Sequence, residues 1–497
     1  MELDKDLASI QEVRNLLAAA KKAQTVLAGY DQQRIDSLVE TVGAACEAEA
    51  ARLGCMAAEE TGFGVPADKA LKNILASRGI LDSIRGMRTI AVVAEDKEKR
   101  IVDIAVPVGV VAALIPSTNP TSTVIYKALI SLKAGNAVVI SPHPGAKKCI
   151  LETVDIIRRA IKSAGAPEDA VQAIHLPTIE ATNALMRHPD TGLILATGGP
   201  AMVKAAYSSG NPALGVGAGN GPAFIERSAN IAAAVKRIID SKTFDNGTIC
   251  ASEQSIVVEA CIRDEVVREA TRQGCLFLDA EQSKKLAAVL LRANGSMNPA
   301  IVGKSAAHIA GMVGLMIPAG TRVLVSEQTT VGHANPYSRE KLCPVLGFYV
   351  EEDWKAACNR CIEILENEGI GHTMTIHSEN QEVIREFALK KPVMRLLVNT
   401  PAALGGVGAT TNLPPAFTLG CGAVGNTATS DNVTPLNLLN IRRLAWGVRE
   451  IETLRKDAPA PCPAPVAQSG GAPAVSAKQL EEIVAEVVAR LAAHTNR

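Results

Sequence analysis

Two stretches decide the fold: Gly109-Val-Val-Ala-Ala-Leu-Ile115 and, after a turn and a helical run, Ala137-Val-Val-Ile140. Both are short, continuous apolar runs, which are typical of parallel strands covered on both faces. The first leads into the polar turn Pro116–Thr121 and the second into Ser141-Pro-His-Pro144. We therefore predict a β-α-β-α unit whose polar turns lie at the carboxyl ends of the strands, where open α/β sheets bind ligands.

The alternation of strands and helices continues along the chain. Residues 170–176 and 192–196 are predicted strands, and residues 179–187 a helix between them. The second strand leads into Thr197-Gly-Gly-Pro200, where glycine allows close approach of the backbone and Pro200 suits the first turn of a helix. A helix N-terminus there can hold a phosphate, or the turn can simply connect two elements. The motif is not the dinucleotide fingerprint G-x-G-x-x-G. From residue 255 the pattern starts again, which predicts a second α/β domain.

The overall composition indicates an ordinary globular chain. Of its 497 residues, 47 % are hydrophobic, and 51 basic residues balance 51 acidic ones. Zero net charge gives no general case for binding nucleic acid or a membrane. The N-terminus does not resemble a signal peptide, and no apolar run reaches the ~18 residues of a membrane span.

The cysteines predict reduced thiols and a cytoplasmic setting. There are eleven, an odd number, and they are scattered rather than arranged in a framework. Cys358-x-x-Cys361 lies in a helical pattern with no second pair at zinc spacing, so we predict a structural role and no metal site.

One cysteine lies in an unusual setting. The stretch Phe244-Asp-Asn-Gly-Thr-Ile-Cys250-Ala-Ser-Glu-Gln254 is rich in turn residues, and the predicted strand 255–258 follows it. Asn246-Gly247 favours a tight turn because both residues tolerate positive φ. A thiol on such a bend can face a cleft as a nucleophile, or it can be a small buried apolar residue like most free cysteines.

Two further stretches are rich in glycine. Residues 214–223 hold four glycines, which indicates backbone packed tightly against another strand or a ligand. Residues 401–435 form a long predicted loop rich in Gly, Thr and Pro, and loops of this length are usually functional.

The end of the chain differs from the rest. Residues 458–475 are a low-complexity Ala/Pro/Gly linker, and residues 476–492 a predicted amphipathic helix. Its apolar stripe consists of Leu480, Ile483, Val484, Val487, Val488 and Leu491. The stripe can pack back onto the body of the protein or dock on a partner surface. Membrane adsorption is less favoured because the polar face is not basic.

Five motifs together resemble the CoA-acylating aldehyde dehydrogenases, over residues 5–455. They are Phe244–Gln254, Pro116–Thr121, Ser141–Pro144, Thr197–Pro200 and Gly369-Ile-Gly-His-Thr373. The resemblance is greatest to the propionaldehyde and acetaldehyde dehydrogenases of bacterial microcompartments and to the aldehyde half of bifunctional aldehyde–alcohol dehydrogenases.

The resemblance implies an α/β aldehyde dehydrogenase fold. A Rossmann-like NAD-binding domain would span residues 1–239, with an oligomerisation arm near 98–107 and a return segment 426–455. The catalytic domain would span residues 240–425. Two or four subunits would assemble through the arm and the return segment.

It also implies covalent catalysis with a short aldehyde, NAD and coenzyme A. The Cys250 thiolate would attack the aldehyde, and a thioacyl enzyme would pass its acyl group to the CoA thiol. Thr118 or Asn119 would support the oxyanion, and both remain candidates. Hydrolytic relatives carry a glutamate base for water where this chain has Val216, which favours a thiol as acyl acceptor. His372 would touch the cofactor, assist the thiol step, or be structural.

The implied cofactor residues lie in several of the same motifs. Glu340 matches the glutamate that binds the nicotinamide ribose, and Gly198 and Gly199 lie at the pyrophosphate turn. Ser141, His143 and Pro144 would line the adenosine side, and Gly217 and Gly219 belong to the glycine run. Ser141 replaces the lysine usual in the family, so the sequence does not decide between NAD and NADP.

Two functional hypotheses follow from the sequence. In the first, the protein is a propionaldehyde or acetaldehyde dehydrogenase in the lumen of a bacterial microcompartment, and the helix 476–492 is an encapsulation peptide that binds a shell protein. In the second, it is a non-acylating or non-catalytic scaffold that acts mainly through that helix.

Overall fold

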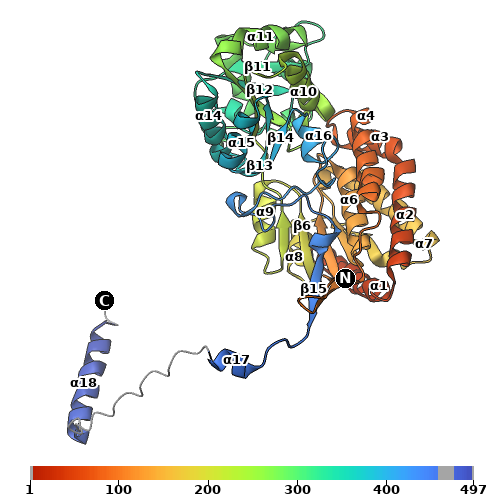
Figure 1. The fold of residues 1–497 in the computed structure, drawn as a ribbon, viewed down its shortest axis with the longest axis vertical. Coiled ribbons are helices and arrows are strands. Elements are labelled where there is room, and N and C mark those ends of the chain that lie inside the picture. The colour runs from red at the N-terminus through yellow and green to blue at the C-terminus, as the bar shows by residue number, and fades with distance from the viewer. Residues whose placement is uncertain (1–3, 457–474, 495–497) are drawn as a thin grey trace. The chain divides into compact units, whose positions relative to one another are not determined.

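The computed structural model describes residues 4–456 and 475–494. Contacts divide the chain into one compact unit up to Leu444 and a second unit from Ala445 onwards. The first unit contains two parallel sheets with helices on both faces (Figure 1). The α/β class predicted from the alternating pattern is therefore confirmed.

The first sheet has five parallel strands in the order β5-β4-β3-β6-β7. Its strands are β3 (Val110–Leu114), β4 (Ala137–Ser141), β5 (Val171–Ala173), β6 (Thr191–Ala196) and β7 (Ala213–Gly215). All five residues of β3 are buried, because they alternate between two hydrophobic clusters on opposite faces of the sheet. The strand order reverses between β3 and β6, so a ligand-binding crevice is expected at their carboxyl ends.

Helices cover both faces of this sheet (Figure 1). One face is covered by α2 (Gln32–Ala48), α6 (Pro120–Lys133) and α7 (Lys147–Ser163), and the other by α1 (Lys5–Leu27), α8 (Ile179–Arg187) and α9 (Pro200–Tyr207). Beside α2 lie α3 (Ala50–Thr61), α4 (Pro66–Ile74) and α5 (Ile80–Ile84). Helix α4 begins at a proline in its first turn, which suits the fixed φ of that residue.

The second sheet has seven parallel strands in the order β10-β11-β12-β9-β8-β13-β14. They are β8 (Gly221–Ile225), β9 (Glu253–Glu259), β10 (Cys275–Phe277), β11 (Val323–Glu327), β12 (Val345–Glu351), β13 (Gly371–His377) and β14 (Val393–Val398). Its helices are α10 (Ile231–Thr243), α11 (Arg263–Arg272), α12 (Ala280–Leu290), α13 (Ala306–Met312), α14 (Trp354–Asn367) and α15 (Gln381–Lys390), and the short α16 (Ala402–Gly406) lies in the long predicted loop.

The chain passes between the sheets earlier than the expected boundary at 239/240. Strand β8 pairs with β9 and β13, and helix α10 packs in the core of the second sheet. The chain therefore crosses from the first sheet to the second between Gly215 and Gly221, inside the glycine run. The boundary implied by the resemblance assigns β8 and α10 to the first domain, whereas both belong to the second sheet.

A separate three-stranded sheet contains the expected arm. It has the order β1-β2-β15, with β1 (Ala91–Asp96), β2 (Ile101–Pro107) and β15 (Leu439–Ala445). The arm predicted near 98–107 is thus part of a hairpin, and the return segment supplies its third strand. Ile441 and Leu444 on β15 are exposed apolar residues.

The second unit contains α17 (Ile451–Lys456) and α18 (Ala477–His494). The predicted linker 458–475 lies outside the described residues except for Val475. The predicted helix is confirmed, and Leu480, Ile483, Val484, Val487 and Val488 are each at least 50 % exposed. No helix in the described part of the chain is both long and apolar enough to cross a membrane.

Candidate active site

A cleft of about 240 Å³ lies at the carboxyl ends of strands in the first sheet. Loops that follow β3, β4, β6 and β7 form one wall, and the segments that precede β9 and β12 form the other. Its lining includes Thr118, Asn119, His143, Gly198, Gly199, Val216, Gly217, Thr248, Cys250, Glu340 and Leu342. The structure therefore brings together residues from all but one of the five motifs.

A strained turn presents Cys250 to this cleft. Asp245, Asn246 and Gly247 follow one another with φ values of 49°, 51° and 78°, in the left-handed region that non-glycine residues rarely adopt. The turn ends α10 sharply, and Cys250 follows it as a partly buried residue on the cleft wall. The predicted Asn-Gly turn is therefore present, and the left-handed conformation extends back to Asp245.

The thiol of Cys250 is protonated near neutral pH in the free protein. Burial raises its pKa to about 12, and the nearby Glu340 carboxylate adds to the rise, while Arg395 opposes it. A cation bound in the cleft would favour the thiolate.

Thr118 and Asn119 both line the cleft on the loop after β3. The Asn119 amide nitrogen donates to the backbone carbonyl of Thr248 at 3.1 Å and lies 3.4 Å from the Thr118 hydroxyl. Its carbonyl oxygen accepts from Lys72 at 2.6 Å. Both oxyanion candidates are therefore present beside Cys250.

The glycine run forms the wall beside Cys250. Val216 and Gly217 line the cleft, and Glu340 is the sole carboxylate among the described lining residues. Gly219 does not line it: a Cβ at this position would overlap with the carbonyl of Cys250. Its backbone packs against the loop that carries Cys250, and its predicted contact with the cofactor stays a prediction.

Glu340 faces the cleft from the segment before β12. Its Oε1 accepts from the backbone N–H of Gly219 at 3.1 Å, and its own backbone N–H donates to Glu368 at 2.8 Å. Burial and then the Glu368 carboxylate raise the pKa of Glu340 to about 8, so this group is mostly protonated at neutral pH.

A larger cavity of about 530 Å³ continues from the cleft across the ends of β3, β4 and β6. The two share Pro116, His143 and Thr197–Pro200. Ser141 and Pro144 line the larger cavity, and the Ser141 hydroxyl bonds to that of Thr182 at 2.9 Å. His143 accepts from the N–H of Gly145 at 3.0 Å, and burial lowers its pKa.

The Gly-Gly turn leaves space for a ligand. Helix α9 has no side-chain cap on its N-terminus, and a Cβ at Gly199 would find no atom within 4 Å. An uncapped helix N-terminus beside open space fits an anionic group such as a pyrophosphate.

His372 is not among the residues that line the cleft. It is fully buried at the start of β13, and its Nδ1 bonds to the Thr373 hydroxyl at 3.0 Å. Burial, and then the Arg395 guanidinium, lower the pKa of His372 to about 3, so the ring is neutral. Its Nε2 has no hydrogen-bond partner among the described residues.

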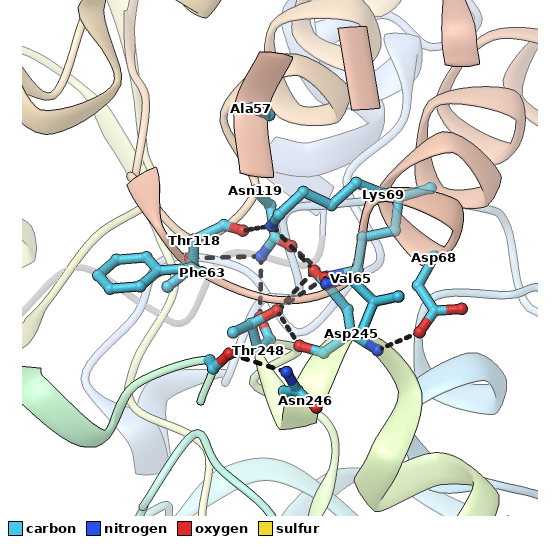
Figure 2. A network of polar contacts seen from close by, with 12 residues as sticks. Ala57, Phe63, Val65, Asp68, Lys69, Thr118, Asn119, Asp245, Asn246 and Thr248 are labelled. Atoms are coloured by element: carbon cyan, nitrogen blue, oxygen red, sulfur yellow. Dashed lines mark hydrogen bonds and ion pairs between the residues drawn. The ribbon is translucent and has the colours of Figure 1, made fainter. Parts of the chain in front are cut away.

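Several residues of the site were not singled out from the sequence. Thr248 and Leu342 line the cleft, and Ile179, 77 % exposed, lines the larger cavity. Lys69, Lys72 and Asp245 are buried, and Figure 2 shows Lys69 and Asp245 beside Thr118, Asn119 and Thr248. The turn and helix patterns of the sequence did not indicate that these charged side chains are buried, because lysines on a short helix normally point to solvent.

The predicted roles of two other cysteines can also be compared with the structure. Cys358 and Cys361 are buried in α14, and the Cys358 sulfur accepts from Lys391 at 2.6 Å. The described residues contain no group of three or more His, Cys, Asp or Glu that could hold a metal ion. Both cysteines pack in a hydrophobic cluster of the second sheet.

A thiol in the crevice at the carboxyl ends of the first sheet, facing a second α/β sheet, suits a class of enzyme that binds a nucleotide and works through a covalent intermediate. Residues 5–335 match the model of the aldehyde dehydrogenase family, and the chain belongs to this family. Its α/β architecture is the aldehyde dehydrogenase fold.

Curated relatives include CoA-acylating members of the family. The chain is 42 % identical over 442 residues to the bifunctional aldehyde-alcohol dehydrogenase of Escherichia coli, covering 88 % of this chain and 50 % of that protein. It is 36 % identical over 438 residues to the acetylating succinate-semialdehyde dehydrogenase of Clostridium kluyveri, covering 88 % and 96 % of the two chains. The chain thus spans half the length of the first relative and nearly all of the second.

Solved structures agree with this assignment. A probable aldehyde dehydrogenase from Listeria monocytogenes is 61 % identical with a TM-score of 0.90, over 91 % of this chain and 100 % of that one. An acetylating aldehyde dehydrogenase from Geobacillus thermoglucosidasius is 51 % identical with a TM-score of 0.89, over 90 % of this chain and 99 % of that one.

Two more distant structures come from propionaldehyde dehydrogenases. One is from the fucose utilisation microcompartment of Clostridium phytofermentans (29 % identity, TM-score 0.81, coverage 87 % and 97 %). The other, from Rhodopseudomonas palustris, has bound propionyl-CoA. It is 28 % identical with a TM-score of 0.80, over 87 % of this chain and 94 % of that one. The resemblance to acylating aldehyde dehydrogenases seen in the sequence is confirmed.

Proposed function

We propose that the protein oxidises a short aliphatic aldehyde to its acyl-CoA thioester with reduction of NAD. The observation that carries the proposal is that Cys250 and Val216 line one cleft. A nucleophilic thiol is present, and a side chain that could activate water is absent from the position where hydrolytic relatives have it.

Cys250 is the nucleophile. The thiol releases its proton to solvent, and the sulfur bonds to the aldehyde carbon while Thr118 or Asn119 donates to the developing oxyanion. Loss of hydride from the same carbon leaves a thioester on Cys250. The sulfur of CoA then attacks this thioester, the Cys250 sulfur leaves with its proton restored, and acyl-CoA is released.

NAD, when bound, would supply the acceptor for this hydride. The fit rests on the open space beside Gly199, the uncapped N-terminus of α9 and the larger cavity lined by Ser141, His143 and Pro144. Glu340 lines the cleft, and its carboxyl oxygens suit a hydrogen bond from a ribose hydroxyl. The role of Glu340 is compatible with either NAD or NADP.

Val216 disfavours water as the acyl acceptor. It is 4 % exposed and cannot abstract a proton. A thiol has a pKa near 8.5 and supplies its own anion far more readily than water does. Transfer to CoA is therefore favoured over hydrolysis to the acid.

An apolar cavity of about 320 Å³ suits an unsubstituted aldehyde chain. Its lining includes Ile249, next to the nucleophile, together with Leu71, Leu75, Phe244, Leu404, Val407 and Phe417. The cations in the described lining, Lys72 and Arg78, are paired with Asp245 and Glu47. The similar succinate-semialdehyde dehydrogenase is named for an aldehyde with a carboxylate, and this cavity offers no unpaired cation for one. Acetaldehyde and propionaldehyde both fit, because one methylene changes binding by only about 1–3 kcal/mol.

The test is an assay of NADH formation from propionaldehyde and NAD, with and without CoA. Multiple turnovers that require CoA support the proposal. Equal multiple turnovers without CoA indicate a hydrolytic enzyme, and no NADH in either reaction leaves the scaffold hypothesis.

We further propose that the enzyme acts in the lumen of a bacterial microcompartment as a homodimer or homotetramer. The exposed apolar stripe of α18 supports docking on a shell protein, and the Clostridium phytofermentans structure comes from such a compartment. The exposed residues of β15 support pairing between subunits.

A further inference from the structure

A buried network of charges connects the two catalytic loops to helix α4 (Figure 2). Lys69 and Lys72 come from α4, Asp245 from the nucleophile turn and Asn119 from the loop after β3. Lys69, Lys72 and Asp245 are each at least 97 % buried. Buried charges are costly unless they are paired and hydrogen-bonded, so each of these contacts constrains its partners strongly.

Asp245 fixes the strained turn. Its Oδ1 accepts from the backbone N–H of Val65 at 2.7 Å, and its Oδ2 accepts from Lys69 at 3.0 Å, from the Thr248 hydroxyl at 2.7 Å and from Lys72. Burial alone would raise the pKa of Asp245, but the two lysines hold it below its usual value. The carboxylate is therefore charged and saturated with donors.

Lys72 contacts the amide of Asn119 directly. Its Nζ donates to the Asn119 Oδ1 at 2.6 Å, to the Thr248 hydroxyl at 3.1 Å and to Asp245. An ammonium group has three donors and no acceptor. The carbonyl end of the amide must therefore face Lys72, and the nitrogen end must face the opposite side.

This orientation determines what the amide offers to the cleft. The Asn119 Nδ2 donates one N–H to the Thr248 carbonyl at 3.1 Å. The other N–H points toward the Thr118 hydroxyl at 3.4 Å, a long contact that an oxyanion in the cleft could replace. A flipped amide would present an oxygen to the oxyanion instead, and the two would repel.

We propose that Lys72 is a positioning residue that locks the Asn119 amide with its N–H toward the cleft, which makes Asn119 the oxyanion donor. The inference rests on the proposed function. It selects Asn119 over Thr118 through a contact with a residue 47 positions earlier in the chain.

Lys69 provides a matched control. It lies on the same helix, is equally buried and shares the Asp245 partner, but it donates to the Thr118 carbonyl at 3.0 Å and not to the Asn119 amide. Lys69→Met therefore removes a buried ion pair and leaves the amide anchored.

The experiment measures the first turnover of NADH in rapid mixing without CoA, which reports formation of the thioacyl enzyme. One oxyanion donor is worth about 10²–10³ in rate, so Lys72→Met is expected to slow this step roughly 10- to 100-fold with little change in the KM for NAD. Lys69→Met is expected to slow it no more than about 3-fold, with a similar loss of thermal stability.

A double-mutant cycle separates positioning from general damage. In an Asn119→Ala background, Lys72→Met should slow the step by less than about 2-fold, because the group through which Lys72 acts is gone. An equal loss in both backgrounds would overturn the proposal. If Lys72→Met lacks a cooperative thermal transition, the same cycle is run with Lys72→Gln, which retains a polar side chain.

Failure of this proposal is distinguishable from failure of the proposed function. A wild-type enzyme that forms no NADH overturns both. A wild-type enzyme with a normal first turnover and an unaffected Lys72→Met variant overturns the role of Lys72 alone.

Discussion

The backbone N–H of Gly219 donates to the Glu340 carboxylate at 3.1 Å, and the same glycine packs against the carbonyl of Cys250. Gly219 thus connects Glu340, the carboxyl group of the cleft, to the loop that carries Cys250. Because the pKa of Glu340 is raised to about 8, this carboxyl changes its charge in the range where the enzyme would be assayed.

We expect the reactivity of Cys250 to depend on this charge. Below pH 8 Glu340 is protonated and has little effect; above pH 8 its negative charge disfavours the thiolate. Glu340→Gln should therefore alkylate with iodoacetamide at the wild-type rate at pH 6.5 and roughly 3- to 10-fold faster at pH 9.5. Mass spectrometry of the peptide that contains Cys250 gives the rates. A ratio that does not change with pH would remove this role of Glu340.

Replacement of the nucleophile should abolish turnover. Cys250→Ala is expected to lower NADH formation at least about 10³-fold, because Cys250 is the sole thiol among the described residues that line the cleft. Cys55→Ala changes an exposed thiol and is the control, with activity within about 2-fold of wild type. Intact-protein mass spectrometry without CoA should show an acyl adduct on wild type and on Cys55→Ala. Substantial activity in Cys250→Ala would contradict the assignment.

A carboxylate at position 216 should open a hydrolytic route. Val216→Glu places a general base on the wall beside Cys250, and general bases typically contribute about 10²–10⁴ in rate. We expect free acid to form without CoA at least about 10-fold faster than in wild type, as measured by chromatography of the products. Val216→Gln has similar size and no basic oxygen, and it should not gain this activity. Equal gains in both variants would point to access of water instead.

The turn at Asp245 should also be sensitive to Gly64. Gly64 has a φ of 77°, and a Cβ there would overlap with the Asp245 carboxylate. Gly86 has the same φ but no atom within 4 Å of the corresponding Cβ. Both alanine variants pay about 1–2 kcal/mol of backbone strain, and Gly64→Ala should lose stability and activity beyond that. Chemical denaturation and the NADH assay provide the comparison, and equal stability of the two variants would contradict it.

Removal of residues 458–497 should separate catalysis from localisation. The site lies within the first unit, so we expect activity within about 2-fold of wild type and loss of co-sedimentation with microcompartment shells. Val484→Glu places a charge in the apolar stripe and should have the same effect on sedimentation, whereas Glu482→Gln should not. A collapse of activity on truncation would show that the helix belongs to the enzyme body.

The strands and the loops of the site were predicted from the sequence more accurately than the contacts between the residues of the site. The apolar runs that became β3 and β4 and the polar turns after them were recognisable because local pattern determines them. The choice between Thr118 and Asn119 could not be made, because the orientation of the amide depends on Lys72, a distant residue that no sequence motif singled out. The close approach of backbone at Gly219 was predicted from the glycine run, but spacing alone did not show that the neighbour on its Cα is the carbonyl of Cys250.

The close packing of the glycine run also limits how this enzyme could change its substrate. A Cβ at Gly219 would overlap with the carbonyl of Cys250, and a Cβ at Gly221 would overlap with that of Thr373. The glycine run beside Cys250 therefore consists of tightly packed backbone. Substitution there would disrupt the nucleophile before it altered selectivity. If the cavity around Ile249 holds the aldehyde chain, as proposed, divergence toward longer or charged aldehydes would proceed through its apolar side chains.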